Sequence, residues 1–322
     1  MNVLWRNLLA MLLLIVVSPV LSQPNNYPSK PIRFVVPFSA GSATDILVRI
    51  IGPKLYEAWG QQLVVDNRPS AGGTVAGSLV ATALPDGYTL LATSSAFAGS
   101  AALYPKLPYD SIRDFSGITQ IASTPLLVVV APSLGVKTLK EFLALAKQKP
   151  NQLNFASTGI GSGTHYATEL FNYVAGISAL HVPYRGVPEG LNDTISGHTH
   201  YYVAPVLPSL SLIRSGRLLA LAASTSQRIA LLPDVPTAAE AGVPYEYDGW
   251  YGILAPAKTP RAIINKLNAE VGRILESAEI RDKIVSLGGV VKTSTPQAFE
   301  ILIREEIVKR RKIFTVAGVK PE

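Results

Sequence analysis

The sequence predicts an α/β protein of two domains, each built on a mainly parallel sheet that helices cover. Apolar, β-branched runs alternate with Gly-, Ser- and Thr-rich loops and then with helical patterns, which is typical of parallel sheets. The 322 residues correspond to about two domains at roughly 100–200 residues per domain. Because no low-complexity linker separates the two domains, we expect strands themselves to cross between them.

A distinct segment precedes the first domain. Arg6 is the only charged residue in residues 1–22, and it precedes an apolar run from Leu8 to Val17. This run is too short to span a bilayer, and Pro19 and the small residue Ser22 follow it. We therefore predict a cleavable secretory signal peptide over residues 1–22 and a mature protein that is soluble outside the cytoplasm. An uncleaved N-terminal anchor is the alternative.

The first domain begins with strand–loop–helix units. Residues 32–37, apolar except for Arg33, lead into a loop at residues 38–45. Gly52-Pro53 is expected to bend the helix that follows, whose apolar residues recur at helical spacing: Ile46, Leu47, Ile50, Ile51 and Leu55. The next predicted elements are a strand at residues 62–66, a small-residue helix from Thr74 and a strand at residues 90–94.

The second domain opens on a strand that we expect to be buried on both faces. Residues 126–131 are all aliphatic, which is typical of a strand with apolar neighbours on either side. Thr138 and Glu141 have the spacing of a capping box and predict a helix that continues through Lys147. The next expected elements are a strand at residues 153–156, a loop at residues 157–164 and a helix from His165 to about Val174.

Two amphipathic helices are predicted near the C-terminus. Thr259-Pro260 and Thr295-Pro296 each place an N-cap residue before a proline in the first helical turn. Gly288-Gly289 is expected to end the first of these helices. The second contains the densest basic run, at residues 309–312. Because two glutamates lie four residues before its first two cations, we interpret this run as a solvated helix face.

The loops at residues 38–45 and 157–164 share a design that points to anion binding. Each is rich in small residues, follows a buried strand and opens a helix whose first N–H groups have no intrahelical partner. These N–H groups and the helix dipole attract anions. Hydroxyl groups add neutral donors: Ser39, Ser42, Thr44, Ser157, Thr158, Ser162 and Thr164. Either loop alone is also consistent with an ordinary βα turn, but one in each domain favours ligand binding.

Carboxylate is the anion that these loops predict. A phosphate-binding P-loop needs Lys-Ser or Lys-Thr after its final glycine, and neither loop has that lysine. The dinucleotide pattern fails as well, because Thr164 stands where its third glycine belongs. A carboxylate needs fewer positive charges and can be held by N–H and hydroxyl donors alone.

Charge and cysteine content exclude several classes of protein. The chain has 29 Lys and Arg against 22 Asp and Glu, a net charge of +7. Without Arg6 the balance is 28 minus 22, or +6, and it is spread along the chain without a nucleic-acid reading module. We expect no nucleic-acid partner. The absence of cysteine excludes disulfides, thiolate catalysis and thiolate zinc sites.

The sequence favours a binding protein over an enzyme. It contains no Gly-x-Ser-x-Gly elbow and no His-Glu-x-x-His helix. His198 and His200 would share one face of a strand, but no third metal ligand is evident. His165 starts a helix beside the second loop, as a pocket residue or a local capping partner. We predict no catalytic residue, cofactor or metal; a secreted hydrolase that uses Ser157 or Ser162 with His165 is the enzymatic alternative.

Motifs in a fixed order carry a family resemblance from Tyr27 to the C-terminus. They are YPSKPIR at 27–33, VPF at 36–38, VDNRP at 65–69, PDGYTL at 85–90, LPYD at 107–110, NFASTGIGSGTH at 154–165, HVPYRG at 181–186, LPDVPT at 232–237, EAG at 240–242 and WYG at 250–252. With these motifs the chain resembles the Bug/TctC family of periplasmic solute receptors over nearly its whole length.

The resemblance implies a two-lobed, type II-like periplasmic binding protein whose α/β domains are joined by crossover strands. The crossings would fall near residues 124–130 and 247–254, so that domain 1 comprises residues 23–125 and 248–322, and domain 2 residues 126–247. Relatives of this kind capture a small carboxylate between the domains and deliver it to the membrane components of a tripartite tricarboxylate transporter. Some serve instead as ligand-sensing adaptors for a membrane signalling protein. We expect a monomer.

The same resemblance assigns the ligand site to the two loops and to six residues outside them. The implied ligand-binding residues are Phe38, Ser39, Ala40, Gly41, Ser42, Thr44, Asp45, Ser94, Ser95, Ser157, Thr158, Gly161, Ser162, Thr164, His165, Tyr184, Arg185 and Ala204. Relatives often carry Phe-Asp-Asn where this chain has Ala204-Pro205-Val206. This departure predicts a less polar far end of the pocket, which favours an aromatic or aliphatic mono- or dicarboxylate over citrate.

The first loop also departs from the family pattern. Relatives usually have a Pro-Gly-Gly-Gly-like stretch before Thr-Asp, whereas this chain has Ser39-Ala40-Gly41-Ser42-Ala43. With fewer glycines, the backbone of this loop has less conformational freedom.

Overall fold

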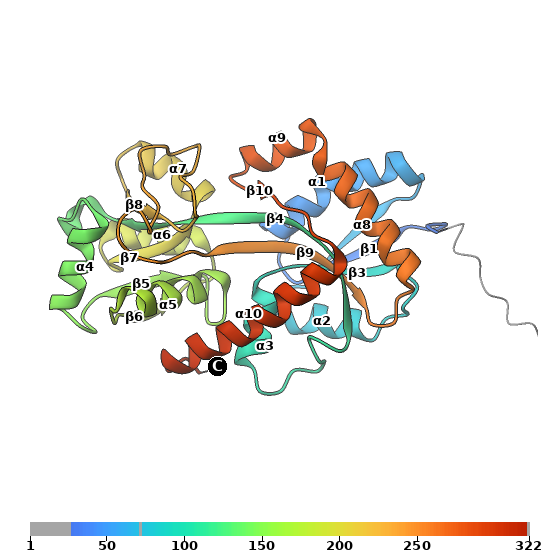
Figure 1. Cartoon of the computed structure of the whole chain (residues 1–322), viewed down its shortest axis with the longest axis horizontal. Coiled ribbons are helices and arrows are strands. Elements are labelled where there is room, and N and C mark those ends of the chain that lie inside the picture. Colours follow the sequence, from blue (N-terminus) through green and yellow to red (C-terminus); the bar gives the residue numbers. More distant parts are fainter. Residues whose placement is uncertain (1–26, 71–72, 321–322) are drawn as a thin grey trace, which may run out of the picture.

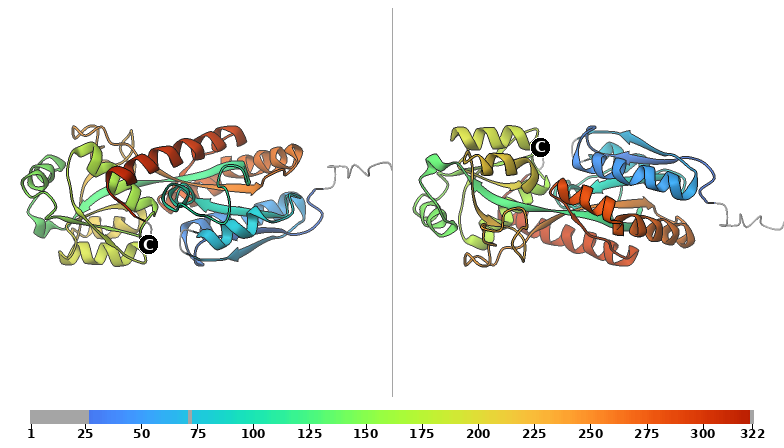
Figure 2. Two further views of the ribbon diagram at one scale, coloured as in Figure 1. Left: turned by 90° about the horizontal axis from the view of Figure 1, so that it is seen from below. Right: turned by 90° about the horizontal axis from the view of Figure 1, so that it is seen from above.

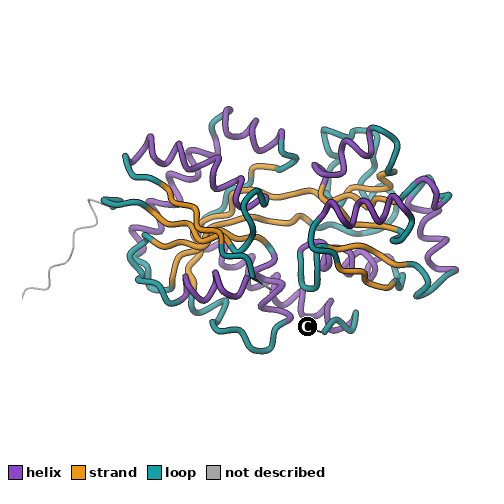
Figure 3. The backbone as a smooth tube through the Cα atoms, turned by 180° about the vertical axis from the view of Figure 1, so that it is seen from behind, coloured by secondary structure: helices purple, strands orange, loops and turns teal. Residues whose placement is uncertain are grey.

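The computed structural model describes residues 27–70 and 73–320, and it consists of two lobes arranged along one long axis (Figure 1). The signal peptide predicted over residues 1–22 lies outside the described residues. Strands lie in the middle of each lobe with helices on either side (Figure 3). No helix within the described ranges is long and apolar enough to cross a membrane.

The first lobe is built on a mixed sheet that begins with three parallel strands. β1 (Ile32–Val36) lies between β2 (Leu63–Asn67) and β3 (Thr89–Ser94). β9 (Asp248–Pro256) pairs antiparallel with β3, and β4 (Phe115–Val130) pairs antiparallel with β9 and with the short β10 (Val290–Val291). The helices are α1 (Ala43–Trp59), α2 (Thr74–Ala81), α3 (Ala96–Leu103), α8 (Arg261–Glu276) and α9 (Ala278–Ser286).

The second lobe repeats this plan around three other parallel strands. β5 (Asn154–Ser157) lies between β6 (Leu180–Pro183) and β7 (Tyr201–Pro205). The end of β4 pairs antiparallel with β7 and with β8 (Leu219–Ala223). A short 3₁₀ turn, η3 (Pro132–Leu134), and four helices complete the lobe: α4 (Leu139–Gln148), α5 (Gly163–Ala175), α6 (Val187–Ser196) and α7 (Val206–Arg214).

β4 joins the two lobes by changing its partners. Residues Phe115–Pro125 pair with β9, and Leu126–Val130 pair with β7 and β8. In the second stretch Leu126, Val128 and Val130 pack into one hydrophobic cluster, while Leu127 and Val129 pack into another on the opposite face. This alternation explains the purely aliphatic run and confirms that the strand is buried on both faces.

The fold is therefore the expected α/β fold with crossing strands. Within the described residues, ten strands form one continuous sheet in which β9 lies between β3 and β4. The antiparallel pairs that β4 and β9 make were not expected, because the sequence pattern shows only strands followed by helices. The division into domains at residues 125 and 247 stays a prediction.

Helix α10 (Pro296–Val316) packs against both lobes. Its first half inserts Phe299, Ile303 and Ile307 into a cluster of the first lobe, and its second half inserts Ile313 and Phe314 into the core of the second. Figure 2 shows this C-terminal helix running along the molecule from one lobe to the other.

Local capping signals had mixed outcomes. The predicted caps at Thr138 and Thr295 are confirmed, because each hydroxyl accepts the backbone N–H three residues later. The N-cap predicted at Thr259 is wrong: Pro260 caps α8, and the Thr259 hydroxyl donates to the Pro256 carbonyl oxygen. The helix expected to run to Gly288 is instead two helices, which meet at Ser277.

Helix α1 continues through Pro53 to Trp59, and a bend at Pro53 stays a prediction. The chain before residue 126 differs from expectation, because β4 already begins at Phe115. Polar and small residues interrupt that first stretch, so its sequence lacks the pattern of a buried strand. The stretch becomes a strand through its pairing with β9.

Candidate functional site

The candidate site is a cleft between the two lobes. It consists of two adjoining cavities of about 500 and 630 Å³. Both are lined by Phe38, Ser42, Ala96, Thr158, Ser162 and Arg185. Because parallel strands end and helices begin at this junction, the cleft lies where open α/β sheets usually bind ligands.

The two loops that face the cleft have the same cap, at residues 41–45 and 161–165. Asp45 N donates to Ser42 Oγ at 3.4 Å, and Gly41 N donates back to Asp45 Oδ2 at 2.9 Å. In the second loop His165 N donates to Ser162 Oγ and Gly161 N donates to His165 Nδ1, both at 3.1 Å. Each helix thus begins with a reciprocal pair of bonds, as in a capping box.

Left-handed glycines make this cap possible. Gly41 has φ +82° and Gly161 has φ +75°, a region that residues with a Cβ rarely adopt. The first two N–H groups of each following helix have no partner in the described structure, namely those of Ala43, Thr44, Gly163 and Thr164. The cleft is therefore flanked by two helix N-termini with free donors, one from each lobe.

Asp45 holds the first loop in its conformation through hydrogen bonds. The residue is 1% exposed, and its side chain accepts hydrogen bonds from Gly41 N, Arg49 Nε and Asn67 Nδ2. Burial raises the pKa of Asp45, but the bonds from Arg49, Gly41 and Asn67 outweigh it, so the pKa lies below its ordinary value. A carboxylate that is ionised and fully engaged with the protein holds the loop and does not face the cleft.

A histidine pair supports the second loop. The rings of His165 and His181 stack with centroids 3.8 Å apart, and His181 Nε2 lies 2.6 Å from Ser157 Oγ. Burial and the nearby His165 lower the pKa of His181 to about 3, so this imidazole is neutral at ordinary pH. Ser157 Oγ also accepts from Gly159 N at 3.1 Å, which ties the pair to the loop backbone.

These contacts do not support the hydrolase alternative. Ser157 and His181 have the distance of a nucleophile and its base, but Ser157 is completely buried and cannot reach a substrate. Ser162 accepts from the backbone of His165, whose Nδ1 is occupied by Gly161 N. Both serines therefore shape the loop.

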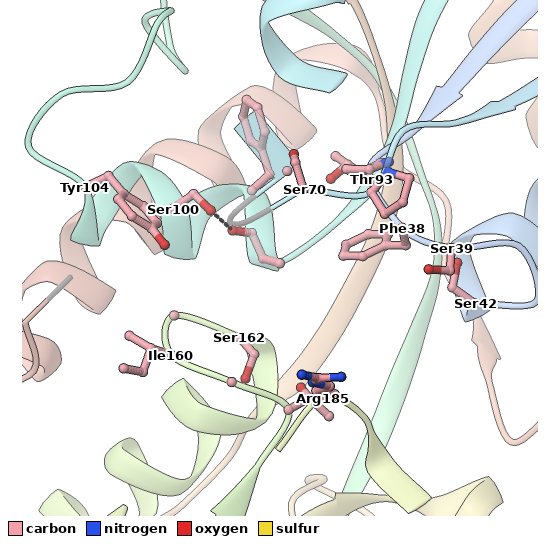
Figure 4. Close-up of a pocket in the computed structure, with 18 of the residues that line it drawn as sticks. Phe38, Ser39, Ser42, Ser70, Thr93, Ser100, Tyr104, Ile160, Ser162 and Arg185 are labelled. Carbon is pink, nitrogen blue, oxygen red and sulfur yellow. Dashed lines mark hydrogen bonds between the residues drawn. The ribbon is translucent and has the colours of Figure 1, made fainter. Parts of the chain in front are cut away.

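Arg185 supplies the positive charge of the cleft. Among the described residues that line the two cavities it is the only charged one, and no acidic group is present there. It is exposed and makes no hydrogen bond or ion pair with another described residue. Figure 4 shows Arg185 in the second lobe opposite Phe38 and Ser39 of the first. The guanidinium is available to an anion.

The two cavities differ in polarity. The smaller is lined by hydroxyl groups, from Ser39, Ser70, Thr93, Ser100 and Tyr104 (Figure 4). The larger is lined by apolar side chains, from Ile46, Leu47, Val187, Pro205, Leu207, Pro208 and Leu287. An anion held at Arg185 thus has polar groups on one side and an apolar chamber on the other.

Eleven of the residues named from the sequence line this cleft: Phe38, Ser39, Gly41, Ser42, Ser94, Ser95, Thr158, Gly161, Ser162, Thr164 and Arg185. The other seven do not line it: Ala40, Thr44, Asp45, Ser157, His165, Tyr184 and Ala204. The Tyr184 hydroxyl donates to Asp193 Oδ2 at 2.8 Å, and Ala204 is fully buried in β7. Whether each residue contacts a ligand stays a prediction.

The departure at Ala204-Pro205-Val206 predicts a less polar far end of the pocket, and Pro205 lines the apolar chamber, but the sequence did not point to Leu207, Leu287 or Tyr247. Leu207 and Pro208 follow β7 directly, so the rule that ligands bind at strand ends could have found them. Leu287 comes from the end of α9, and only tertiary folding brings it to the cleft. Tyr247 gave no pattern, because it precedes a crossing strand.

His198 and His200 do not share a strand face, which corrects the expectation from their spacing. Both precede β7; His198 Nδ1 lies 3.4 Å from Asp193 Oδ1, and His200 Nδ1 lies 2.6 Å from Asn154 Oδ1. In residues 27–70 and 73–320 no group of three or more potential ligands is arranged to hold a metal ion.

Comparison with known proteins places this fold and cleft in a family. The model of the tripartite tricarboxylate transporter family receptor, TctC, matches residues 47–319. Protein BugT of Bordetella pertussis is 32% identical over 299 residues, which are 92% of each chain.

Two solved structures with bound ligands are similar along nearly the whole chain. The R. palustris Rpa4515 protein with adipate has a TM-score of 0.81 and 34% identity, covering 92% of this chain and 100% of the other. MatC from Rhodopseudomonas palustris with bound malate has a TM-score of 0.77 and 32% identity, covering 89% and 99%. The chain therefore belongs to the TctC/Bug family of periplasmic solute-binding proteins, which are transporter receptors and not enzymes.

Proposed function

We propose that this protein captures a small carboxylate in the cleft between its lobes and delivers it to the membrane components of a tripartite tricarboxylate transporter. One observation carries the proposal: two capped helix N-termini with free N–H groups flank a cleft whose only described charge is Arg185. Such a site attracts an anion and supplies donors for its oxygens. Two relatives of similar structure hold adipate and malate.

The carboxylate group binds between Ser42 and Ser162, next to Arg185, in this proposal. The rest of the ligand extends into the apolar chamber formed with Leu47, Leu207 and other aliphatic groups. Burial of such a chain is favourable by about 0.8 kcal/mol per CH₂ group. An aliphatic or aromatic mono- or dicarboxylate therefore fits better than citrate, whose additional charged groups find no further cation among the described lining residues.

The rest of the proposal concerns location and motion. We propose that residues 1–22 direct export to the periplasm and are then removed. The lobes, divided at residues 125 and 247, close on the ligand by bending of the crossing strands. The protein works as a monomer. Uptake of a bound acid by cells that lack this protein should fall, whereas a sensing adaptor would leave uptake intact.

Calorimetric titration with adipate, malate, benzoate and citrate tests the site. We expect saturable binding of adipate or benzoate that is tighter than binding of citrate. Arg185→Met should weaken binding by about 10- to 100-fold, because a hydrogen bond to a charged group is worth about 1.5–3 kcal/mol. Stability should not change, since Arg185 is exposed and unpaired within the described structure.

Arg217→Met is the matched control, because Arg217 is an exposed arginine of the same lobe that lines neither cavity. It should bind every acid as the wild type does. Equal affinity in wild type and Arg185→Met would refute the assignment of the carboxylate to Arg185.

A further inference from the structure

A chain of buried polar groups leads from α10 to the wall of the cleft. Trp250 Nε1 and Arg310 Nε both donate to Glu306 Oε2, at 3.0 and 3.2 Å. Arg310 Nη2 donates to Tyr247 Oη at 2.7 Å, and Tyr247 Oη lies 3.0 Å from Ser95 Oγ. Ser95 and Tyr247 line the larger cavity. These hydrogen bonds thus connect the charge of Arg310, which lies outside the cleft, to the Ser95 hydroxyl in the wall of the cleft.

The arginine at the base of this chain is held rigidly. Arg310 belongs to the basic run at residues 309–312, for which the sequence predicts a solvated helix face, but it has no exposed surface. Its guanidinium carbon lies 4.2 Å from the ring centroid of Tyr166. A buried charge is costly unless it is paired, and Glu306 pairs with it here. Tyr247 and Ser95 are also buried, at 6% and 4% exposure. Water therefore competes little for these hydrogen bonds.

The direction of each hydrogen bond follows from the chemistry of arginine. Arginine has only donors, so Tyr247 Oη must accept from Arg310. Burial raises the pKa of Tyr247 more than the nearby Arg310 lowers it, so the phenol keeps its proton. Its only other hydrogen-bond partner among the described residues is Ser95 Oγ. The Tyr247 O–H therefore donates to Ser95.

Ser95 is left with one hydrogen to donate. Its hydroxyl makes no second hydrogen bond within the described structure. It stands beside the N-terminus of α5, because a methyl group added at Gly163 would lie 3.2 Å from Ser95 Oγ. An anion bound at that helix N-terminus is thus next to an unused hydroxyl hydrogen.

We propose that Arg310 and Tyr247 are positioning residues that fix the Ser95 hydroxyl as a hydrogen-bond donor to the bound carboxylate. The inference rests on the proposed function, because it assigns the orientation of one group in that binding site. Without Tyr247 the Ser95 hydroxyl loses the donor that directs it. Its hydrogen is then no longer held toward the ligand.

A double-mutant cycle measured by calorimetry, with adipate and malate as probes, tests this coupling. The variants are Ser95→Ala, Tyr247→Phe and the double variant in the full-length mature protein. Each single change should weaken binding by about tenfold, the value of one hydrogen bond. The double variant should be within about twofold of either single variant, because both changes remove the same donor.

Tyr245→Phe is the control. It removes a buried tyrosine hydroxyl two residues away, which donates to the Ala167 carbonyl oxygen at 3.1 Å and does not line the cleft. It should lower the unfolding midpoint by less than Tyr247→Phe, which also removes the acceptor of the buried Arg310 Nη2, and leave both affinities unchanged. Loss of affinity in Tyr245→Phe equal to that in Tyr247→Phe would show a general effect of stability and overturn the inference.

The remaining outcomes separate the inference from the proposed function. A wild-type protein that binds neither probe nor benzoate overturns both. A wild type that binds a probe while Ser95→Ala or Tyr247→Phe binds it equally well overturns the inference alone. A double variant weakened by about a hundredfold also overturns it, because independent effects multiply.

Discussion

At the scale of single residues, the two ligand loops reach the same geometry with different side chains. A carboxylate at Asp45 and an imidazole at His165 both accept the N–H of a left-handed glycine four residues earlier. The carboxylate is ionised and pairs with Arg49, whereas the imidazole stacks on His181. Only the first loop therefore depends on a charge for its shape.

This difference makes the stability of the first loop sensitive to acid. The pKa of Asp45 is lower in the folded protein than its unfolded value of about 3.9, so its stabilisation is complete above that value and disappears as the pH falls through the folded pKa. Asp45→Asn should lower the free energy of unfolding by about 1–3 kcal/mol at pH 7 and by less below about pH 4.

Urea unfolding of both proteins from pH 7 to pH 3 measures this. Asp282→Asn, at an exposed position without an ion pair in the described structure, should change the free energy by less than about 0.5 kcal/mol. If the difference in free energy of unfolding between wild type and Asp45→Asn stayed constant from pH 7 to pH 3, the role given to the ionised carboxylate would be contradicted.

Much of the site could be predicted at this scale, but the orientation of its side chains could not. The hydroxyl-rich loops and Arg185 follow from local sequence, and the structure brings them together at one cleft. The family motifs predict Asp45 and His165 as ligand residues, yet both accept loop N–H groups. A sequence motif identifies which residues are near a ligand, whereas the direction of a side chain depends on bonds that only the folded loop defines.

At the scale of elements, sequence patterns that depend on neighbouring residues predicted the structure. Elements that form by pairing with distant strands could not be predicted. The caps at Thr138 and Thr295 depend on one hydroxyl and one nearby N–H. The first part of β4 depends on β9, which lies more than a hundred residues away in the chain. Likewise, no glycine or proline indicates in the sequence that one helix ends and another begins at Ser277.

The close approach of α3 to the loop at residues 157–164 can be tested by adding a methyl group between them. A methyl group at Gly99 would lie 2.3 Å from the Gly161 carbonyl oxygen, so the helix and loop would have to separate. At a solvent-exposed helix position, replacing Gly by Ala stabilises the helix by about 1 kcal/mol. Gly99→Ala should instead weaken adipate binding at least several-fold, measured by calorimetry.

Gly272→Ala is the control for helix propensity, because Gly272 lies in α8 with nothing within 4 Å of the added methyl group. It should stabilise the protein and leave adipate binding unchanged. If Gly99→Ala also stabilised the protein at full affinity, the close approach of α3 and the loop would have no part in binding.

At the scale of the whole molecule, α10 couples the stability of the lobes. Phe314 belongs to the core of the second lobe, although the helix that carries it begins on the first. Trp59 and Trp250 pack in first-lobe clusters, and residues 126–247 contain no tryptophan. Tryptophan fluorescence therefore reports on the first lobe.

Phe314→Ala should lower the free energy of unfolding by about 3–5 kcal/mol through the cavity it leaves. If the lobes unfold together, the urea midpoint measured by tryptophan fluorescence should fall as far as the one measured by circular dichroism. Val308→Ala, at a 68% exposed position of the same helix, is the control. If Phe314→Ala left the urea midpoint measured by fluorescence unchanged, the first lobe would unfold independently of the second.

The position of β9 also sets an order for synthesis. β9 lies between β3 and β4, but the ribosome adds it only after every strand of the second lobe. Until then one edge of β3 has no partner, whereas β4 to β8 are already complete. The strands of the second lobe can pair first, against the usual order in which N-terminal domains lead, and Ile313 and Phe314 of α10 complete its core later. A newly made chain must therefore be kept from pairing through that open edge, which is a site where strands of other molecules can add.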